Sequence, residues 1–183
     1  VACDLMAQAE HDINAQSILI TDNISFAERV QNEIKILINN LPRKEIIKKS
    51  LDFNGLILLV DDIIESTNII NYIAPEHLHI QVKEGDKIAK NVYNSGCIFL
   101  GEHTSEAFGD YIVGTNHILP TFGSSKFSSG LGVLDFMKRN SYVFMNKSSH
   151  NKLSERVKDM ASIEKLDGHK LSVTIRQNSK KKL

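Results

Sequence analysis

Several polar residues of this chain occur in sequence contexts unlike those of an ordinary surface. They are Gln8 and His11 in MAQAEHD, Glu76 and His77 in IAPEHL, Asp110 in FGDY, His117 in NHILP, and His169 in LDGHK. Imidazole and carboxylate groups bind zinc or transfer protons. A structural metal site tends to be local in sequence, whereas a catalytic site collects residues from the ends of several elements. The dispersion of these residues therefore favours an enzyme site.

The two adjacent pairs each allow two interpretations. Gln8 and His11 are three apart in a helical pattern, so both project from one helix face, either as zinc ligands or as ordinary polar residues. Glu76 and His77 follow Pro75, which restricts the backbone that enters their loop. A carboxylate beside an imidazole suits general-base chemistry, but an exposed loop pair would have the same sequence.

The remaining candidates are also ambiguous from spacing alone. Asp110 follows a glycine, so it is either a metal ligand or a turn residue, and His117 either binds substrate or is structural. Glu164 and His169 are five apart, and we expect Gly168 to end a helix and let His169 turn back. The other histidines, His79, His103 and His150, are interpreted as residues outside the site. His79 is expected on the polar face of a strand.

Composition excludes several classes of protein. The chain has 183 residues, 42% apolar, with 22 basic and 22 acidic residues, so it can bury a core and offers no nucleic-acid footprint or anionic-membrane surface. The sequence shows no apolar stretch long enough to span a bilayer, no signal peptide and no glycine-rich phosphate loop. Two cysteines far apart, Cys3 and Cys97, suit a reducing compartment, so we expect a cytoplasmic protein.

The first hundred residues alternate between strand and helix patterns. The expected strands are 17–21, 56–60, 78–82 and 97–101, and the expected helices are 24–40, 61–74 and 84–94. Asp22 or Ser25 can cap the first of these helices, and Gly96 fits the cap after the last. This rhythm predicts an α/β fold with a mostly parallel sheet covered by helices.

The pattern changes after residue 101. A loop-rich stretch, 105–130, contains Asp110 and His117, and such long loops are often functional. Beyond it we expect a helix over 131–138, strand-like runs at 141–145 and 171–175, and a helix over 149–166. The last part is poor in core residues, so it should pack on another domain or subunit. The predicted domains are 1–138 and 139–183. Val1 opens directly into a helical pattern, which suggests a chain cut from a larger protein or a processed terminus.

Taken in order, AQAEHD, APEHL, GDYIVGTNHILPT, FSSGLGVLDFMKR and EKLDGHKLSV resemble the carboxyl-terminal half of histidinol dehydrogenase over residues 1–176. The resemblance implies zinc-dependent, NAD-linked oxidation of L-histidinol to L-histidine through L-histidinaldehyde, the last step of histidine biosynthesis. It implies an incomplete Rossmann-like parallel sheet with helices on both faces, and a small helical carboxyl-terminal appendage. It also implies a homodimer in which the tail of one subunit completes the site of its neighbour.

The resemblance also implies roles for individual residues. Glu76 and His77 would be the acid–base pair, and the zinc ligands would be Gln8, His11, Asp110 and His169. The substrate would be held by Gln8, His11, Asp110, His117, Glu164 and His169. The residues that contact NAD are expected before Val1. A second hypothesis therefore remains open, that of a non-catalytic zinc-binding dimerisation fragment that lacks the NAD site.

Overall fold

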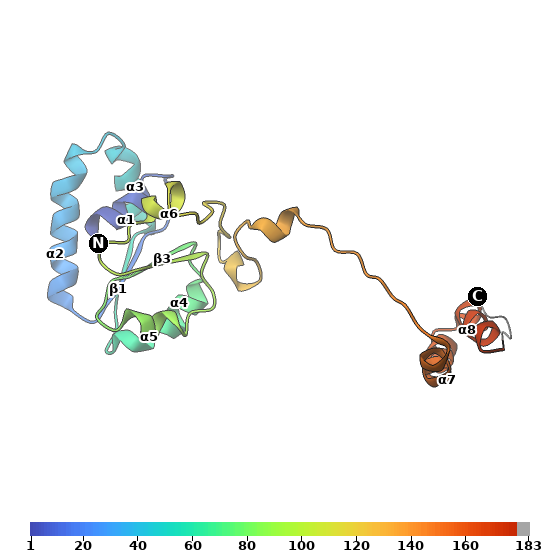
Figure 1. Cartoon of the computed structure of the whole chain (residues 1–183). Coiled ribbons are helices and arrows are strands. Elements are labelled where there is room, and N and C mark those ends of the chain that lie inside the picture. The colour runs from blue at the N-terminus through green and yellow to red at the C-terminus, as the bar shows by residue number, and fades with distance from the viewer. Residues whose placement is uncertain (179–183) are drawn as a thin grey trace. The chain divides into compact units, whose positions relative to one another are not determined.

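The computed structural model describes residues 1–178 and divides the chain into two compact units (Figure 1). Unit 1 is Val1–Phe136, and unit 2 begins at Met137. The helices and strands of unit 1 are α1 Ala2–Ala9, β1 Ile18–Thr21, α2 Ile24–Leu37, α3 Lys44–Asn54, β2 Leu56–Leu59, α4 Ser66–Ile73, β3 His77–Ile80, α5 Gly85–Ala89, β4 Cys97–Leu100 and α6 Glu106–Tyr111. Short 3₁₀ turns lie at Ile38–Asn40, Ile63–Glu65, Ser124–Lys126 and Val133–Phe136.

The four strands form two parallel pairs. β1 pairs with β2 from Ile18↔Leu56 onward, and β3 pairs with β4 from His77↔Cys97 onward. Within the described residues the pairs are separate two-stranded sheets. The expected α/β class with short parallel sheets is confirmed, and all four strands lie where the sequence patterns placed them, within two residues at each end. His77 opens β3 rather than preceding it.

Helices lie on both faces of the β3–β4 pair. Ile80 of β3 belongs to a buried cluster with residues of α4 and α5, and Leu78 packs against the same cluster. His77 and His79 alternate with these residues and point to the opposite face, because successive strand side chains alternate. There they meet Gln8 of α1 and Glu106 of α6. The alternation thus separates an apolar core face from a polar face.

The connection between β1 and β2 differs from the sequence prediction. The expected single helix ends at Leu37 and a second helix, α3, follows a turn at residues 41–43. The amino-terminal cap of α2 is Asn23, whose side chain accepts a hydrogen bond from Phe26 N, rather than Asp22 or Ser25. Ile47 of α3 is fully buried against α1, so the two helices build a small core of their own. This core fixes α1, the helix that carries Gln8 and His11.

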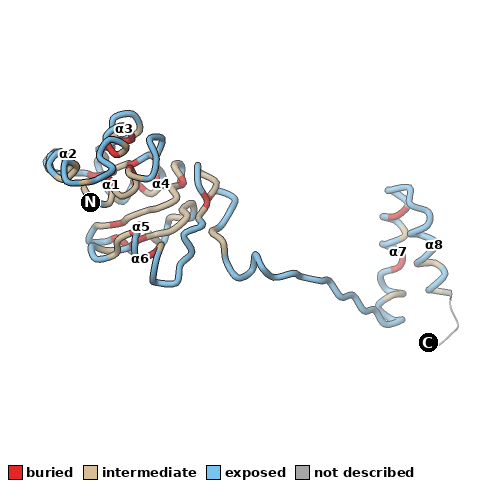
Figure 2. Tube along the Cα trace, turned by 90° about the horizontal axis from the view of Figure 1, so that it is seen from above, coloured by how far each residue is buried: buried red, intermediate tan, exposed pale blue. Residues whose placement is uncertain are grey.

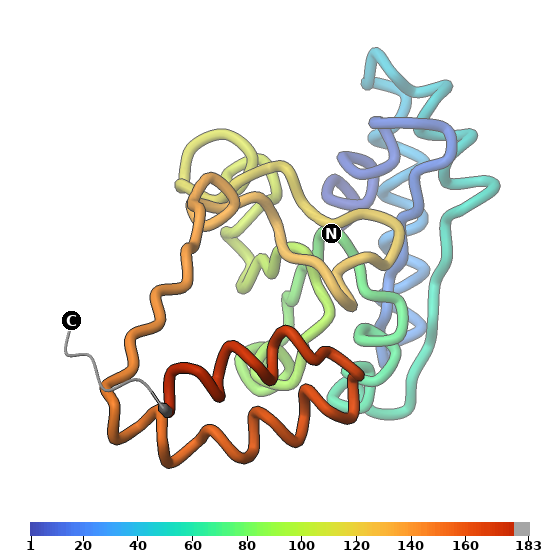
Figure 3. Tube along the Cα trace, turned by 90° about the vertical axis from the view of Figure 1, so that its right-hand side faces the viewer, coloured from blue at the N-terminus to red at the C-terminus, as the bar shows by residue number. Residues whose placement is uncertain are grey.

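Unit 2 is a helical hairpin of α7, Lys147–Ile163, and α8, Asp167–Asn178, which lie side by side (Figures 1 and 3). Asn146 caps α7 through Ser149 N. The left-handed residue that ends α7 is Lys165, with φ of 58°, and Leu166 N returns to Ala161 O. The expectation that Gly168 ends this helix is therefore wrong, because Gly168 lies inside the first turn of α8.

Three further predictions for the second half of the chain are wrong. Residues 171–175 lie in α8 instead of a strand, because this segment packs on α7 as the second helix of the hairpin. Residues 141–145 pair with no strand among the described residues, and of the helix expected over 131–138 only the turn Val133–Phe136 forms. Unit 2 buries few of its residues (Figure 2). No helix within residues 1–178 is long and apolar enough to cross a membrane.

Candidate active site

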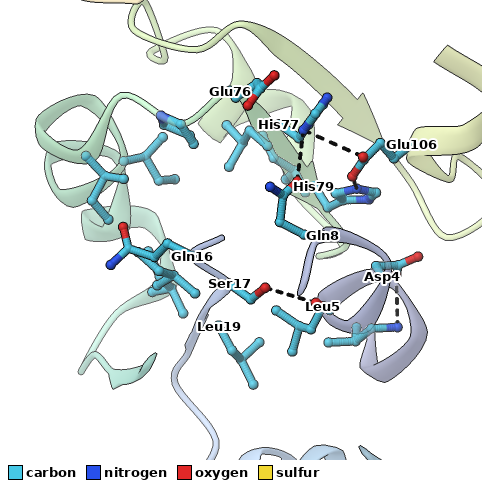
Figure 4. Close-up of a pocket in the computed structure, with 18 of the residues that line it drawn as sticks. Asp4, Leu5, Gln8, Gln16, Ser17, Leu19, Glu76, His77, His79 and Glu106 are labelled. Carbon is cyan, nitrogen blue, oxygen red and sulfur yellow. Dashed lines mark hydrogen bonds and ion pairs between the residues drawn. The ribbon is translucent and has the colours of Figure 1, made fainter. Parts of the chain in front are cut away.

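Two segments far apart in sequence meet where α1 faces the start of β3 (Figure 4). Gln8 Oε1 lies 3.1 Å from His77 Nδ1. An amide oxygen only accepts hydrogen bonds, so this contact places a proton on His77 Nδ1. In the neutral imidazole the other nitrogen, Nε2, is then free to accept a proton. That atom is buried and has no hydrogen-bond partner among the described residues, so in this tautomer it is the ring nitrogen that is left to accept a proton.

A buried carboxylate faces the same imidazole from the other side. Glu106, at the start of α6, is 7% exposed, and its Oε1 lies 3.7 Å from His77 Nδ1. Its second oxygen, Oε2, lies 3.9 Å from His79 Nε2. The His79 ring stacks on Phe99 of β4 with 5.0 Å between centroids. His79 therefore lies on the polar face of its strand, as expected, but in one cluster with His77 and Glu106.

The environment of Glu106 favours its charged form. Burial raises the pKa of this carboxyl, but His79, His77 and His11 lower it by more, so the pKa lies below its ordinary value of 4.5. Glu106 is thus a carboxylate at neutral pH, surrounded by three imidazoles. A buried negative charge of this kind stabilises any positive charge that develops on the neighbouring rings.

The backbone around Glu76 is held in a strained turn. Ala74, which ends α4, has a positive φ of 55° and is 1% exposed, and Pro75 follows it. The hydroxyl of Ser125 donates to Ala74 O at 3.1 Å, and Cys97 N donates to Glu76 O at 2.9 Å. Non-glycine residues in this conformation cost about 1–3 kcal/mol and persist where surrounding contacts hold them, often at functional sites. The turn therefore fixes the point from which the Glu76 side chain leaves the backbone.

Gly96 makes this turn possible through a close approach rather than as a helix cap. A Cβ at residue 96 would lie 2.5 Å from Glu76 O, and Gly96 N donates to Pro75 O at 2.9 Å. α5 ends earlier, at Ala89, so the expected capping role of Gly96 is wrong. The same type of contact positions α6, because a Cβ at Gly109 would lie 2.5 Å from the Phe99 ring. Both glycines let site segments pack directly on the sheet.

The Glu76 carboxyl has a raised pKa. Burial is the largest cause; Glu106 and Asp110 add to it, whereas His77 and His11 oppose it. A carboxyl whose pKa is moved toward neutrality is a better proton acceptor at neutral pH than an ordinary surface glutamate. The buried Glu106 and the half-buried Glu76 thus have pKa values displaced in opposite directions.

A cavity of about 640 Å³ in unit 1 collects most of these groups. Its lining includes Gln8, His11, Glu76, His77 and Glu106. Pockets of this volume accommodate small metabolites. Asp110 does not line the cavity, but its charge reaches Glu76 and also raises the pKa of Cys97, after the larger effect of burial. The arrangement brings a proton acceptor, a second carboxylate and two possible metal ligands to one space.

The other expected site residues are not brought to this cavity. His117 is exposed in the loop after α6, where Asn116 caps the turn through Ile118 N. Glu164 and His169 are exposed in unit 2, at the turn between α7 and α8. Unit 1 therefore holds an incomplete version of the residue set expected from the sequence.

The zinc set is divided in the same way. Within residues 1–178 no three His, Cys, Asp or Glu side chains gather to hold a metal ion. The expected set requires only two such side chains from unit 1, His11 and Asp110, since Gln8 offers an amide oxygen and His169 belongs to unit 2. One imidazole, one carboxylate and one amide oxygen are acceptable oxygen and nitrogen donors for zinc, but a closed tetrahedral site needs a fourth ligand. The donor set of unit 1 fits zinc only if that ligand is added.

Two site residues escaped the sequence analysis, Glu106 and His79. Glu106 lies inside the segment TSEAFGDY, four residues before Asp110, a spacing that puts both on one helix face. This spacing could have indicated from the sequence that Glu106 lies near the expected ligand Asp110. For His79, the separation of two from His77 indicates a shared strand face, but only the structure shows that α6 buries this face.

Comparisons with known proteins identify the family of the chain. The family model of histidinol dehydrogenase matches residues 1–177. The chain is 43% identical to the histidinol dehydrogenase of Aquifex aeolicus over 97% of this chain and 42% of that protein, and 45% identical to that of Rhodospirillum rubrum over 97% and 41%. The crystal structure of the Elizabethkingia anophelis histidinol dehydrogenase superposes with a TM-score of 0.89 at 31% identity, over 96% of this chain and 40% of that one. The chain thus spans about two fifths of the relatives it matches, and it belongs to the histidinol dehydrogenase family.

Proposed function

We propose that this chain supplies the acid–base pair and the zinc ligands of an enzyme that oxidises L-histidinol to L-histidine through L-histidinaldehyde, the last step of histidine biosynthesis, in the cytoplasm. The observation that carries the proposal is the state of His77. Gln8 holds its Nδ1 proton, and its Nε2 atom is buried without a partner beside the cavity. A general base in this position is what removal of an alcohol proton requires.

The reaction consists of two oxidations. In the first, His77 Nε2 accepts the hydroxyl proton of histidinol while a hydride leaves the same carbon, which becomes the aldehyde. In the second, Glu76 accepts a proton from water as the water adds to the aldehyde, a second hydride then leaves the same carbon to give the carboxylic acid, and the acid releases its proton to become the carboxylate. When bound, NAD⁺ would supply the hydride acceptor for each oxidation, and zinc, which Gln8, His11, Asp110 and His169 would hold, would supply an anchor for the imidazole and amine of the substrate. The charge of Glu106 stabilises the protonated His77 ring that the first step produces.

We propose Gln8, His11, Asp110 and His169 as the zinc ligands, and these four with His117 and Glu164 as the substrate-binding residues. Because His169 and Glu164 lie on unit 2, we propose that the enzyme is a homodimer in which unit 2 of one subunit completes the site of its partner. The exposed apolar side chains of unit 2 support this proposal, since they need a surface to cover them. Those on the two helices include Leu153, Val157, Met160, Ile163, Leu171 and Ile175.

The second candidate function is a zinc-binding dimerisation fragment without catalysis. It is favoured by the length of the chain, which spans 42% of the Aquifex aeolicus relative. The NAD site would lie in the part of the enzyme that has no counterpart here. The two candidates make the same prediction for zinc binding and opposite predictions for turnover.

A reconstituted complex separates the two candidates. It consists of this chain co-expressed with the segment of the Aquifex aeolicus histidinol dehydrogenase that has no counterpart in it. With L-histidinol and NAD⁺ we expect two NADH per histidinol consumed. Glu76→Gln should slow oxidation of histidinaldehyde by roughly 10²–10⁴-fold, because an amide cannot accept the proton. Glu102→Gln is the matched control, since Glu102 is exposed. A complex that holds zinc but forms no NADH would favour the second candidate.

A further inference from the structure

A short segment after α6, residues 121–126, packs across the carboxyl-terminal end of α4, and we call it the brace. Three of its residues lie against three consecutive residues of that end: Lys126 faces the Tyr72 ring, Gly123 lies beside Ile73 O, and Ser125 donates to Ala74 O. Ser125 is buried, and its hydroxyl oxygen lies 3.1 Å from Ala74 O. The brace therefore holds the residues that lead directly into Glu76.

The brace is itself held in a defined shape. Phe122 and Gly123 have successive positive φ values of 53° and 74°, which reverse the direction of the chain. The backbone N–H and the hydroxyl of Ser124 both donate to Thr121 O. A non-glycine residue such as Phe122 keeps this conformation only where its surroundings hold it, often at functional sites. Thr121, Phe122 and Gly123 also line the cavity, so the brace connects the cavity wall to the end of α4.

The two side chains of the proposed acid–base pair are held in different ways (Figure 4). The His77 ring contacts Gln8 and lies beside Glu106. Within residues 1–178 no hydrogen bond or ion pair of this kind holds the Glu76 carboxyl. The direction in which this carboxyl points therefore depends on the backbone that carries it.

Two sets of contacts fix that backbone. On the β4 side, the backbone N–H groups of Gly96 and Cys97 donate to the two carbonyls that follow Ala74. On the other side, the Ser125 hydroxyl donates to Ala74 O, and no other donor among the described residues binds this carbonyl. Ala74 is buried and has the strained left-handed conformation. Because a buried carbonyl without a partner is destabilising, the turn without Ser125 has less to hold it in this conformation.

We propose that Ser125 is a positioning residue for the second oxidation: its hydroxyl holds the Ala74 turn so that the Glu76 carboxyl faces the water that adds to the aldehyde. This proposal rests on the proposed function, which assigns the proton-accepting role to Glu76. The first oxidation depends less on Ser125, because His77 is paired in the β3–β4 ladder and its ring is held by Gln8. Loss of the Ser125 hydroxyl should thus affect one oxidation and spare the other.

The test uses the reconstituted complex with Ser125→Ala in this chain. With NAD⁺ and supplied histidinaldehyde, we expect kcat to fall by roughly tenfold with KM unchanged, because a displaced base affects only the chemical step. The first NADH from L-histidinol in a single turnover should form at its normal rate. Ser124→Ala is the matched control, since the Ser124 hydroxyl binds a carbonyl within the brace instead of Ala74 O. Equal slowing of both oxidations, or no slowing of either, would overturn the proposal.

A double substitution shows whether Ser125 acts through Glu76. In a complex that carries Glu76→Gln, we expect Ser125→Ala to cause no further slowing of the residual histidinaldehyde oxidation, because the carboxylate that Ser125 positions is absent. A further loss in that background would mean that Ser125 acts on the site by another route, and would overturn the proposal.

A second variant keeps the test decisive if Ser125→Ala prevents assembly of the complex. Ser125→Cys replaces the hydroxyl by a weaker donor of similar shape. It should slow histidinaldehyde oxidation alone, and normal rates of both oxidations would overturn the proposal. An unsubstituted complex that forms no NADH would refute the proposed function, whereas normal histidinaldehyde oxidation with Ser125→Ala would refute only the role of Ser125.

Discussion

The β3–α6 region and the α7–α8 hairpin both carry expected site residues, but they hold them in different ways. In the first, Glu106, His77 and His79 are at most 18% exposed at their side chains and contact one another. In the second, Glu164 and His169 are exposed at the turn of a hairpin. Charged groups that are already buried and paired are held in position by contacts within their own unit. Those that are exposed need another surface to become a site.

The contrast extends to the apolar residues. The β3 face opposite the histidines is covered by α4 and α5, with Ile80 and Ile88 nearly inaccessible. On the hairpin, Leu153, Val157 and Met160 follow helical spacing and are 41–58% exposed. A helix face of this kind is typical of an element that packs against another body. The contrast supports the proposal that the hairpin docks on a partner, because its apolar face is uncovered whereas that of unit 1 is buried.

The prediction with the largest expected effect tests whether unit 1 and unit 2 contribute ligands to the same zinc ion. We expect His11→Ala in unit 1 and His169→Ala in unit 2 each to reduce the zinc affinity of the reconstituted complex by more than about 10-fold, since even removal of a residue that only supports a ligand costs 10–100-fold. His103→Ala is the control, because His103 is 93% exposed. Metal analysis after dialysis against a weak chelator provides the measurement. Full zinc retention by both variants would show that the two regions do not share a metal.

The second prediction concerns the two glutamates within the buried region. Glu106→Gln should lower the stability of the chain at pH 7 by about 1–2 kcal/mol, or roughly 3–6 °C in Tm, because it removes the charge that the histidines surround. Glu76→Gln should raise stability at pH 7, because burial disfavours the charge that it removes. Thermal unfolding of the two variants checks this pair.

The pH dependence of both differences follows from the displaced pKa values. The pKa of Glu106 lies below 4.5, so its stabilising effect is complete above pH 4.5 and is lost as the pH falls through its folded-state pKa. The pKa of Glu76 in the folded state lies above 4.5. Protonated Glu76 therefore contributes its full stabilisation of the folded state below pH 4.5, and this contribution is lost as the pH rises through the folded-state pKa. Unfolding curves that show the same sign for both variants at pH 7 would contradict the account.

The smallest expected effect lies in the hairpin. Gly168→Ala should stabilise α8 by about 0.5–1 kcal/mol, since Gly168 is helical and nothing lies within 4 Å of an added Cβ. Lys165→Gly should also stabilise, because Lys165 has the left-handed conformation that glycine adopts without strain. A loss of helicity or Tm with Gly168→Ala would mean that residue 168, and not residue 165, ends a helix.

The sequence was informative where local patterns and global fold agree. Continuous apolar runs at 56–60 and 97–101 became parallel strands, and alternation at 78–82 placed His79 on a polar strand face, whereas only the structure extends that strand back to His77. Apolar run and alternation are strong signals because burial on one or both faces of a sheet produces them directly. Glu76 and His77 were candidates from their adjacency and both line the cavity, whereas Glu106, which also lines it, escaped the sequence analysis.

The errors have a common physical origin. The strand expected at 171–175 is part of α8, because β-branched residues at a helical surface cost little when a hairpin partner stabilises the helix. α3 was missed since its charged outer face hides the few residues, such as Ile47, that it buries. The contact between Gln8 and His77 spans 69 residues, and no local pattern encodes a tertiary contact of that length. Local propensity predicts elements, but packing decides which polar residues meet.

The most direct test of the account is complementation between two inactive full assemblies. One reconstituted complex carries Glu76→Gln and the other carries His169→Ala, and the two are produced together so that mixed dimers form. If unit 2 serves the partner, each mixed dimer contains one site with both changes and one intact site. The account therefore predicts that formation of L-histidine from L-histidinol, which needs both oxidations, returns to roughly one quarter of the normal rate for random pairing. No recovery in mixed dimers would mean that each hairpin serves its own subunit.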